Sequence, residues 1–138
     1  MDQKLAMLSK VPMFAGCTPR DLTEVGRLAE EVMVPAGKVI AREGSSGHEF
    51  FVIAEGNVEI TRGGERVRTL GPGDHFGELA MLGNVPRTAT ATATTPTTLF
   101  VLGHREFATL LADHPETREQ VLRSVALWIS EIAPGKTT

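Results

Sequence analysis

The sequence lacks three features that would point to export, a membrane or nucleic acid. Its 138 residues include one cysteine, Cys17, so no disulfide can form within the chain, and a cytoplasmic location is expected. No basic N-terminal segment precedes an apolar stretch, and no apolar run approaches the ~20 residues that cross a bilayer, so we expect neither a signal peptide nor a membrane span. The net charge of −3 disfavours a nucleic-acid-binding surface, which is usually basic.

Clusters of residues that carry catalysis or bind metals are missing as well. The four histidines are scattered along the chain without the spacing of a zinc site, and we expect them to be solvated or structural. Ser45 and Ser46 have a histidine nearby, but no third group completes a catalytic triad. The sequence therefore predicts neither a metal centre nor an enzyme.

The chain does have an ordinary globular composition, and its pattern begins with helix signals. Hydrophobic residues make up 41% and charged residues 22%, and the length predicts one domain over residues 1–138. Thr18, Pro19 and Asp21 indicate a helix start, as N-cap, first helical residue and acidic first turn. Apolar residues at helical spacing between 22 and 32 extend this helix towards Pro35.

Short apolar or alternating runs follow, separated by glycine-containing turns. Such regular short strands are typical of an antiparallel β-sandwich or barrel. Residues 62–65 (Arg-Gly-Gly-Glu) predict a hairpin turn, because glycine adopts positive φ without steric cost. Alternating Thr and Ala within 88–98 favour a strand over a low-complexity loop, since threonine is β-branched. The other predicted strands lie at 39–40, 50–54, 58–61, 67–70 and 97–102.

Helical spacing returns near the C-terminus. It covers about 104–112 and 116–132, and Pro115 separates the two segments. The predicted fold is therefore mainly β with flanking helices: an antiparallel β-sandwich with N-terminal helices and two C-terminal helices.

The stretch 76–90 is the most informative part of the sequence. It contains one carboxylate, Glu78, and one guanidinium, Arg87, around a short apolar turn. An ionised carboxylate only accepts hydrogen bonds and suits hydroxyl donors, whereas a guanidinium fits a phosphate with two bonds. Gly77 permits positive φ or the close approach of a ligand. A solvated surface pair of Glu78 and Arg87 is the alternative, and residue chemistry alone leaves both interpretations open.

Residues 76–82 (Phe-Gly-Glu-Leu-Ala-Met-Leu) and 86–90 (Pro-Arg-Thr-Ala-Thr) resemble the phosphate-binding cassette of cyclic nucleotide-binding domains. That family includes regulatory subunits of cyclic-AMP-dependent protein kinase, cyclic-GMP-dependent kinases, cyclic nucleotide-gated channels and the bacterial catabolite activator protein. The resemblance extends over about residues 10–133 and implies a jelly-roll sandwich, or double-stranded β-helix. Further matches lie at 42–44, 51–53, 56–60, 71–74, Phe107 and Pro115.

The resemblance implies a role for each matching position of the cassette. Glu78 would accept a hydrogen bond from the ribose 2′-hydroxyl, and Arg87 would pair with the exocyclic oxygens of the cyclic phosphate. Thr88 would bond the phosphate or a purine edge. The remaining cassette contacts to the ligand would come from Phe76, Gly77, Leu79, Ala80 and Ala89.

Two positions outside the cassette complete the predicted site. Ile60 matches a strand position that lines the base pocket in related channels, although an ordinary core role fits it equally well. Trp128 lies where the last helix of those channels supplies a lid over the base, and stacking on a base contributes ~1–3 kcal/mol. The alternative for Trp128 is packing beneath the last helix.

We therefore expect a module that binds a 3′,5′-cyclic nucleotide and responds by moving its C-terminal helices. Residue usage favours cyclic AMP over cyclic GMP, although a threonine after the arginine occurs with both ligands. The expected partner is an effector protein or a fused domain, and a homodimer is compatible with the last helix. The alternatives are a regulatory fragment of a larger enzyme, channel or transcription regulator, and a sandwich that binds nothing. Intact Glu78 and Arg87 argue against the last.

Overall fold

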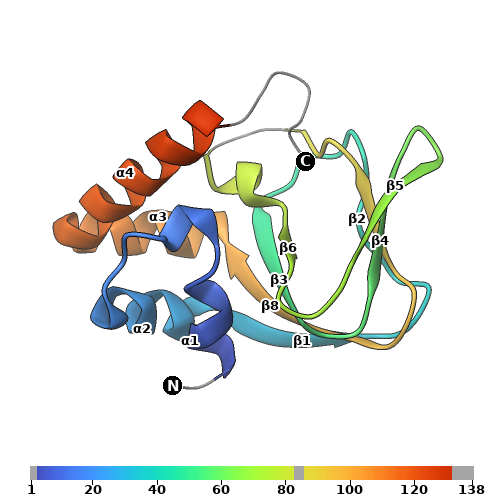
Figure 1. Ribbon diagram of the computed structural model, residues 1–138, viewed down its shortest axis with the longest axis horizontal. Coiled ribbons are helices and arrows are strands. Elements are labelled where there is room, and N and C mark those ends of the chain that lie inside the picture. Colours follow the sequence, from blue (N-terminus) through green and yellow to red (C-terminus); the bar gives the residue numbers. More distant parts are fainter. Residues whose placement is uncertain (1–2, 83–85, 132–138) are drawn as a thin grey trace.

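Two four-stranded antiparallel sheets enclose part of the core, and helices pack at one end of them (Figure 1). The computed structural model describes residues 3–82 and 86–131. The strands are β1 (Glu30–Val34), β2 (Val39–Ala41), β3 (Glu49–Glu55), β4 (Val58–Arg62), β5 (Glu65–Leu70), β6 (His75–Phe76), β7 (Thr90–Ala93) and β8 (Thr97–Gly103). One sheet has the order β1-β8-β3-β6 and the other β2-β7-β4-β5. The sandwich predicted from the sequence is confirmed.

Strand β3 lies at the centre of the molecule because both of its faces are buried. Phe50 and Val52 belong to the core cluster that the helices cover. Phe51 and Ile53 belong to the cluster between the two sheets. Successive side chains of a strand point to opposite faces, so the continuous apolar run from 50 to 54 contributes residues to both clusters.

Strands β4 and β5 form the hairpin predicted at 62–65, and both glycines of its turn have positive φ. A β-bulge beside the turn shifts the pairing by one residue. Thr61 pairs with Arg66, but Ile60 pairs with Arg68 instead of the residue before it. Because paired residues share a face of the sheet, the bulge brings Arg68 beside Ile60.

Three short helical segments precede the sheets: α1 (Gln3–Leu8), the 3₁₀ turn η1 (Pro12–Phe14) and α2 (Pro19–Leu28). The helix start predicted at Thr18 is confirmed by a capping box. The Thr18 hydroxyl accepts a hydrogen bond from the Asp21 N–H at 3.2 Å, and the Asp21 carboxylate accepts one from the Thr18 N–H at 3.1 Å.

The predicted extension of α2 towards Pro35 is wrong. The helix ends at Leu28, and residues 30–34 form β1 at the edge of a sheet. Glu30 pairs with Val101 and Val34 with Thr97 on β8. A strand pairing with a segment some seventy residues away overrides a local helical spacing, which the valines of this stretch support only weakly.

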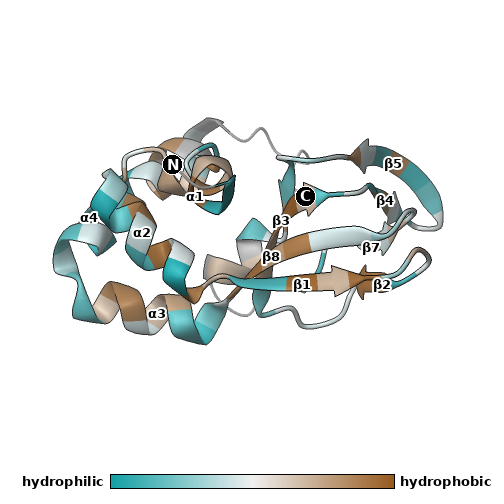
Figure 2. Cartoon of the chain, turned by 90° about the horizontal axis from the view of Figure 1, so that it is seen from below, coloured by the Kyte–Doolittle hydropathy of each residue, from teal (hydrophilic) through white to brown (hydrophobic). Residues whose placement is uncertain are grey.

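The two predicted C-terminal helices are α3 (His104–Asp113) and α4 (Pro115–Glu131), and a further 3₁₀ turn, η2, spans Glu78–Leu82. Apolar and polar bands alternate along α2 and α3 in Figure 2, as expected of helices with one buried face. The Thr117 hydroxyl donates to the Asp21 carboxylate at 2.6 Å, and the Gly16 N–H donates to the Ser124 hydroxyl at 3.1 Å. These bonds fasten α4 to the N-terminal segment. Across the described residues, no helix is sufficiently long and apolar to span a bilayer.

Candidate ligand-binding site

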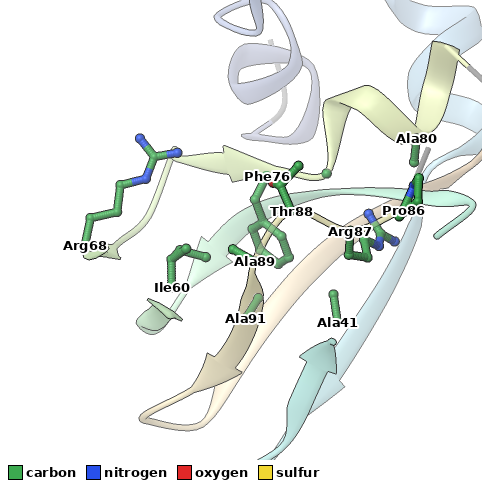
Figure 3. A pocket seen from close by; sticks show the side chains of 11 residues that line it. Ala41, Ile60, Arg68, Phe76, Ala80, Pro86, Arg87, Thr88, Ala89 and Ala91 are labelled. Atoms are coloured by element: carbon green, nitrogen blue, oxygen red, sulfur yellow. The ribbon is translucent and has the colours of Figure 1, made fainter. Parts of the chain in front are cut away.

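A pocket lies between the inner face of the β2-β7-β4-β5 sheet, strand β6 and the turn η2 (Figure 3). Arg87 and Arg68 lie on opposite sides of it, and Ile60 and Ala89 lie between them. The pocket thus has an apolar floor with a guanidinium at each side. It is lined by Ala41, Ile60, Arg68, Phe76, Gly77, Ala80, Pro86, Arg87, Thr88, Ala89 and Ala91.

Arg87 is half-buried, and its charge is only partly compensated. Its guanidinium carbon lies 5.5 Å from the centroid of the Phe51 ring, within cation–π range. Burial lowers the pKa of Arg87 from its ordinary value, while the negative charge of Glu49 acts in the opposite direction. Within residues 3–82 and 86–131, no carboxylate lies at ion-pair distance from this guanidinium. A charge that is withdrawn from water without a close counterion favours the binding of an anion.

Gly77 connects β6 to η2 at the wall of the pocket. Its φ of +84° confirms the positive φ that the sequence allowed for. A Cβ at this position would lie 2.7 Å from Arg87 Nη1 and 2.9 Å from the Glu49 carbonyl oxygen. Glycine is therefore required here both for the backbone conformation and for space.

Glu78 is buried, with 8% of its surface exposed, and it is not among the described residues that line the pocket. Its Oε1 lies 2.6 Å from His75 Nδ1, an ion-pair distance when the imidazole is protonated, although the contact lies outside hydrogen-bond geometry. Its Oε2 is buried and has no hydrogen-bond partner in the described part of the chain. A buried acceptor without a donor is costly, by about 1–3 kcal/mol. The carboxylate is therefore turned towards His75 with one oxygen left to satisfy.

The structure brings most of the predicted site residues together at the pocket. Glu78 follows the lining residue Gly77, but it is not among the described lining residues, and its carboxylate contacts His75. The side chains of Leu79 and Trp128 lie outside the described residues, so the contact and the lid predicted for them stay predictions. The predicted residues that line the pocket are Ile60, Phe76, Gly77, Ala80, Arg87, Thr88 and Ala89.

Four lining residues were not predicted: Ala41, Arg68, Pro86 and Ala91. Ala91 follows Ala89 at strand period, so the Thr-Ala alternation contained a signal for it. Arg68 could not be predicted to lie beside Ile60, because regular pairing from the hairpin turn would place Val67 there and only the bulge replaces it with Arg68. Arg68 matters most chemically, since it adds a second set of hydrogen-bond donors.

Neither the pocket nor its surroundings resemble a metal centre. Within the two described ranges, no group of three or more histidine, cysteine or carboxylate side chains is placed to hold a metal ion.

The main chain beside the pocket is held by ordinary hydrogen bonds: Arg62 Nε donates to the Thr88 carbonyl oxygen at 3.1 Å. The arrangement is suited to binding a small anion with an apolar portion.

Comparison with known proteins identifies the family. A sequence profile described as cyclic nucleotide-binding domain matches residues 31–114. The chain belongs to the cyclic nucleotide-binding domain family. A cyclic nucleotide-gated potassium channel of Mesorhizobium japonicum is 36% identical over 121 residues, which cover 88% of this chain and 33% of the channel. The chain spans 31% to 33% of the length of the first curated relatives that it matches.

Solved structures of cyclic nucleotide-binding domains and of related regulators share the fold. The N-terminal domain of a transcriptional regulator of Streptomyces coelicolor A3(2) matches with a TM-score of 0.84 and 29% identity, over 96% of this chain and 98% of that one. The regulatory domain of PKA from Toxoplasma gondii, solved with cAMP, matches with a TM-score of 0.72 and 32% identity, over 78% and 43%. The jelly-roll fold is confirmed. The relatives include a cyclic nucleotide-gated potassium channel, a cAMP-dependent protein kinase regulatory subunit and a cAMP-activated transcriptional regulator.

Proposed function

We propose that this chain binds a 3′,5′-cyclic nucleotide in the pocket, with cyclic AMP favoured over cyclic GMP, and acts as a ligand-responsive regulatory module. The observation that carries the proposal is the half-buried Arg87 guanidinium at the side of an apolar pocket. The cyclic phosphate would supply its counterion, and a charge-assisted hydrogen bond of this kind contributes about 1.5–3 kcal/mol. The base would lie along Ile60 and Ala91. The PKA regulatory domain solved with cAMP supports this choice of ligand.

The ribose 2′-hydroxyl would bind Glu78. The buried Oε2 of this residue needs a donor, and a sugar hydroxyl provides one. Because Glu78 contacts His75, the carboxylate has to turn towards the pocket when ligand enters. If Glu78 binds the 2′-hydroxyl, then Glu78→Ala and removal of that hydroxyl from the ligand each remove the same hydrogen bond. We therefore expect the 2′-hydroxyl to contribute to affinity in the wild type but hardly at all in Glu78→Ala. Calorimetry of both proteins with cyclic AMP and 2′-deoxy cyclic AMP measures this difference.

The response to ligand would begin at η2 and reach the C-terminal helices. Ala80 lines the pocket and also belongs to the core cluster that contains Phe107 and Leu110 of α3 and Val121 of α4. If η2 rotates to bring Glu78 to the ligand, this movement also displaces Ala80 within the core cluster. Since a packed core resists continuous deformation, the helices repack in response.

Isothermal titration with cyclic AMP and cyclic GMP tests the proposal. We expect the wild type to bind, and Arg87→Ala to weaken binding by at least tenfold, roughly the value of one charge-assisted contact. Arg66→Ala is the matched control, because Arg66 is exposed on β5, does not line the pocket, and its loss changes the net charge equally. Absence of binding heat with both nucleotides in the wild type, or equal losses in the two variants, contradicts the proposal.

A second candidate ligand, cyclic GMP, is favoured by one observation. Arg68 lines the pocket on the side opposite Arg87, where the base of a bound nucleotide would lie. Guanine presents two neighbouring acceptors, O6 and N7, to a guanidinium, whereas adenine presents an acceptor and a donor. Titration of Arg68→Ala with both nucleotides separates the two candidates. A selective loss of cyclic GMP affinity shows that Arg68 recognises guanine, and an unchanged ratio of the two affinities removes the observation that favours cyclic GMP.

The wider setting follows from the same proposal. We take residues 1–138, with a core at about 10–133, as one cytoplasmic domain that acts on an effector protein or on a domain fused to it. The proposal includes a homodimer formed through the last helix. Light scattering of the purified chain with and without ligand measures its oligomeric state. Trp128 is the sole tryptophan, so a change of its fluorescence on addition of nucleotide tests the predicted lid over the base.

A further inference from the structure

Residues 44–46, a short segment before β3, form hydrogen bonds with the main chain at Arg87. The Gly44 N–H donates to the Arg87 carbonyl oxygen at 2.8 Å, and the Arg87 N–H donates to the Ser45 carbonyl oxygen at 2.8 Å. Ser46 forms an isolated antiparallel bridge with Pro86. The segment from 44 to 46 therefore fixes the backbone from which the arginine side chain projects.

The next residue, Gly47, is buried against that side chain. A Cβ on Gly47 would lie 2.6 Å from Arg87 Cδ and closer still to Nε and Cζ. Its φ does not lie in the left-handed region, in contrast to the φ of +82° at Gly44. Glycine at 47 is thus needed for space rather than for backbone freedom.

Three surfaces enclose the guanidinium together. Gly47 lies against its Nε and Cζ, and Gly77 lies against Nη1, where a Cβ would come within 2.7 Å. The Phe51 ring lies 5.5 Å from the guanidinium carbon. Two of these surfaces consist of bare backbone, so Arg87 lies where a side chain at position 47 or 77 would collide with it.

We propose that Gly47 is a positioning residue for the anion-binding arginine: it forms a slot that orients the Arg87 guanidinium towards the pocket. This inference rests on the function proposed above and deepens it. A side chain at 47 displaces a long, flexible arginine rather than the fold, so the first consequence is a misdirected guanidinium. A group that binds a planar anion through two bonds loses most of its affinity when its orientation changes.

Gly47→Ala tests the inference, with Gly71→Ala as the matched control. Gly71 likewise lacks a positive φ, and among the residues described the nearest atom to its added Cβ is Asn57 Oδ1 at 3.4 Å. We expect Gly47→Ala to weaken binding of cyclic AMP and cyclic GMP in titrations by at least about tenfold, and Gly71→Ala to stay within about twofold of the wild type. A wild type that binds and a Gly47→Ala variant of equal affinity overturn the inference.

A thermal double-mutant cycle without ligand separates a slot for Arg87 from a general structural role. Gly47→Ala should change the melting temperature when Arg87 is present and leave it nearly unchanged in the Arg87→Ala background, because the three described atoms nearest to the added methyl group all belong to Arg87. Equal changes in both backgrounds overturn the inference. If the wild type binds neither nucleotide, the proposed ligand is wrong, and the cycle still decides whether Gly47 accommodates Arg87.

Discussion

Arg87 and Glu78 supply the two opposite charges next to the pocket, and each is withdrawn from water in its own way. Arg87 is half-buried against Phe51 and lacks a close carboxylate within the described ranges. Glu78 is almost fully buried, with one oxygen near His75 and the other unsatisfied. A ligand that joins an anion to a hydroxyl donor would satisfy both groups at once. Affinity would then come from relieving two costs that the unliganded chain already bears.

At Gly77 the conformational cost of a side chain can be separated from its effect on Arg87. Gly77→Ala and Gly64→Ala both place alanine at a positive φ, at +84° and +83°, which costs about 1–2 kcal/mol. At Gly64, in the hairpin turn, no described atom lies within 4 Å of the added Cβ, whereas at Gly77 it meets Arg87 Nη1 and the Glu49 carbonyl oxygen. We expect denaturant unfolding to show both losses, the larger at Gly77, and titration to show weakened nucleotide binding only there.

Equal nucleotide affinities of these two variants would contradict the role given to Gly77. A loss of binding in Gly64→Ala would show instead that stability alone controls affinity, since this hairpin glycine is not a lining residue of the pocket.

At the scale of elements, the sequence predicted structure correctly wherever the cause is local. The helix start at Thr18 and the two-glycine hairpin turn depend on neighbouring residues and are present as predicted. Residues 30–34 were wrongly assigned to a helix, because their conformation is decided by pairing with β8 far along the chain. The bulge beside Ile60 also escaped prediction, since no residue in the hairpin requires it.

The residues of the candidate site likewise fall into those that local sequence could predict and those whose positions depend on distant segments. Phe76, Gly77 and Arg87 belong to one continuous cassette and could be named from the sequence. Gly47 and Arg68 come from other segments, and their places depend on tertiary packing and on the register of a hairpin. The contact of Glu78 with His75 depends on the conformation of a side chain, which sequence spacing does not specify.

The contact between α2 and α4 includes the hydrogen bond from Thr117 to Asp21, so its contribution to the free energy of unfolding should depend on pH. Burial raises the pKa of this carboxyl, but hydrogen bonds from Thr117 and Thr18 outweigh burial and the net shift is downward. A lowered pKa in the folded state means stability that is fully present above the unfolded value of about 3.9 and is lost as pH falls through the folded value. Asp21→Ala should therefore cost about 1–2 kcal/mol at pH 7, because it removes the acceptor of the hydrogen bonds from the Thr18 N–H and the Thr117 hydroxyl.

Urea unfolding at pH 7 and at low pH measures this difference. The stabilities of wild type and Asp21→Ala should converge as pH falls below about 3.9 and then through the lower pKa of the folded carboxyl, where that carboxyl takes up its proton. Thr23→Ala serves as a control in the same helix, because Thr23 is exposed and its hydroxyl donates only to the Pro19 carbonyl oxygen among the described residues. A gap between wild type and Asp21→Ala that stays constant with pH would show that the carboxylate charge plays no part.

At the scale of the whole molecule, two core clusters meet at the pocket. One lies between the sheets and includes Ile60 and Phe76, and the other lies under the helices and includes Ala80 and Met81. Both Phe76 and Ala80 line the pocket. A ligand that shifts η2 therefore acts on the helical cluster, while the cluster between the sheets provides a fixed wall.

Ligand should stabilise the fold while changing the C-terminal helices selectively. At about 100 times Kd, cyclic nucleotide adds ~2.7 kcal/mol to the free energy of unfolding, which raises the melting temperature by roughly 7–12 °C for a chain of this size. Amide hydrogen exchange on the same sample should change within η2 and α4, because the helical core repacks, and stay constant in β1 and β8 once the global gain in stability is subtracted. Arg87→Ala should show neither change at the same ligand concentration. A rise in melting temperature without any change in α4 would leave binding intact and refute the movement of the helices.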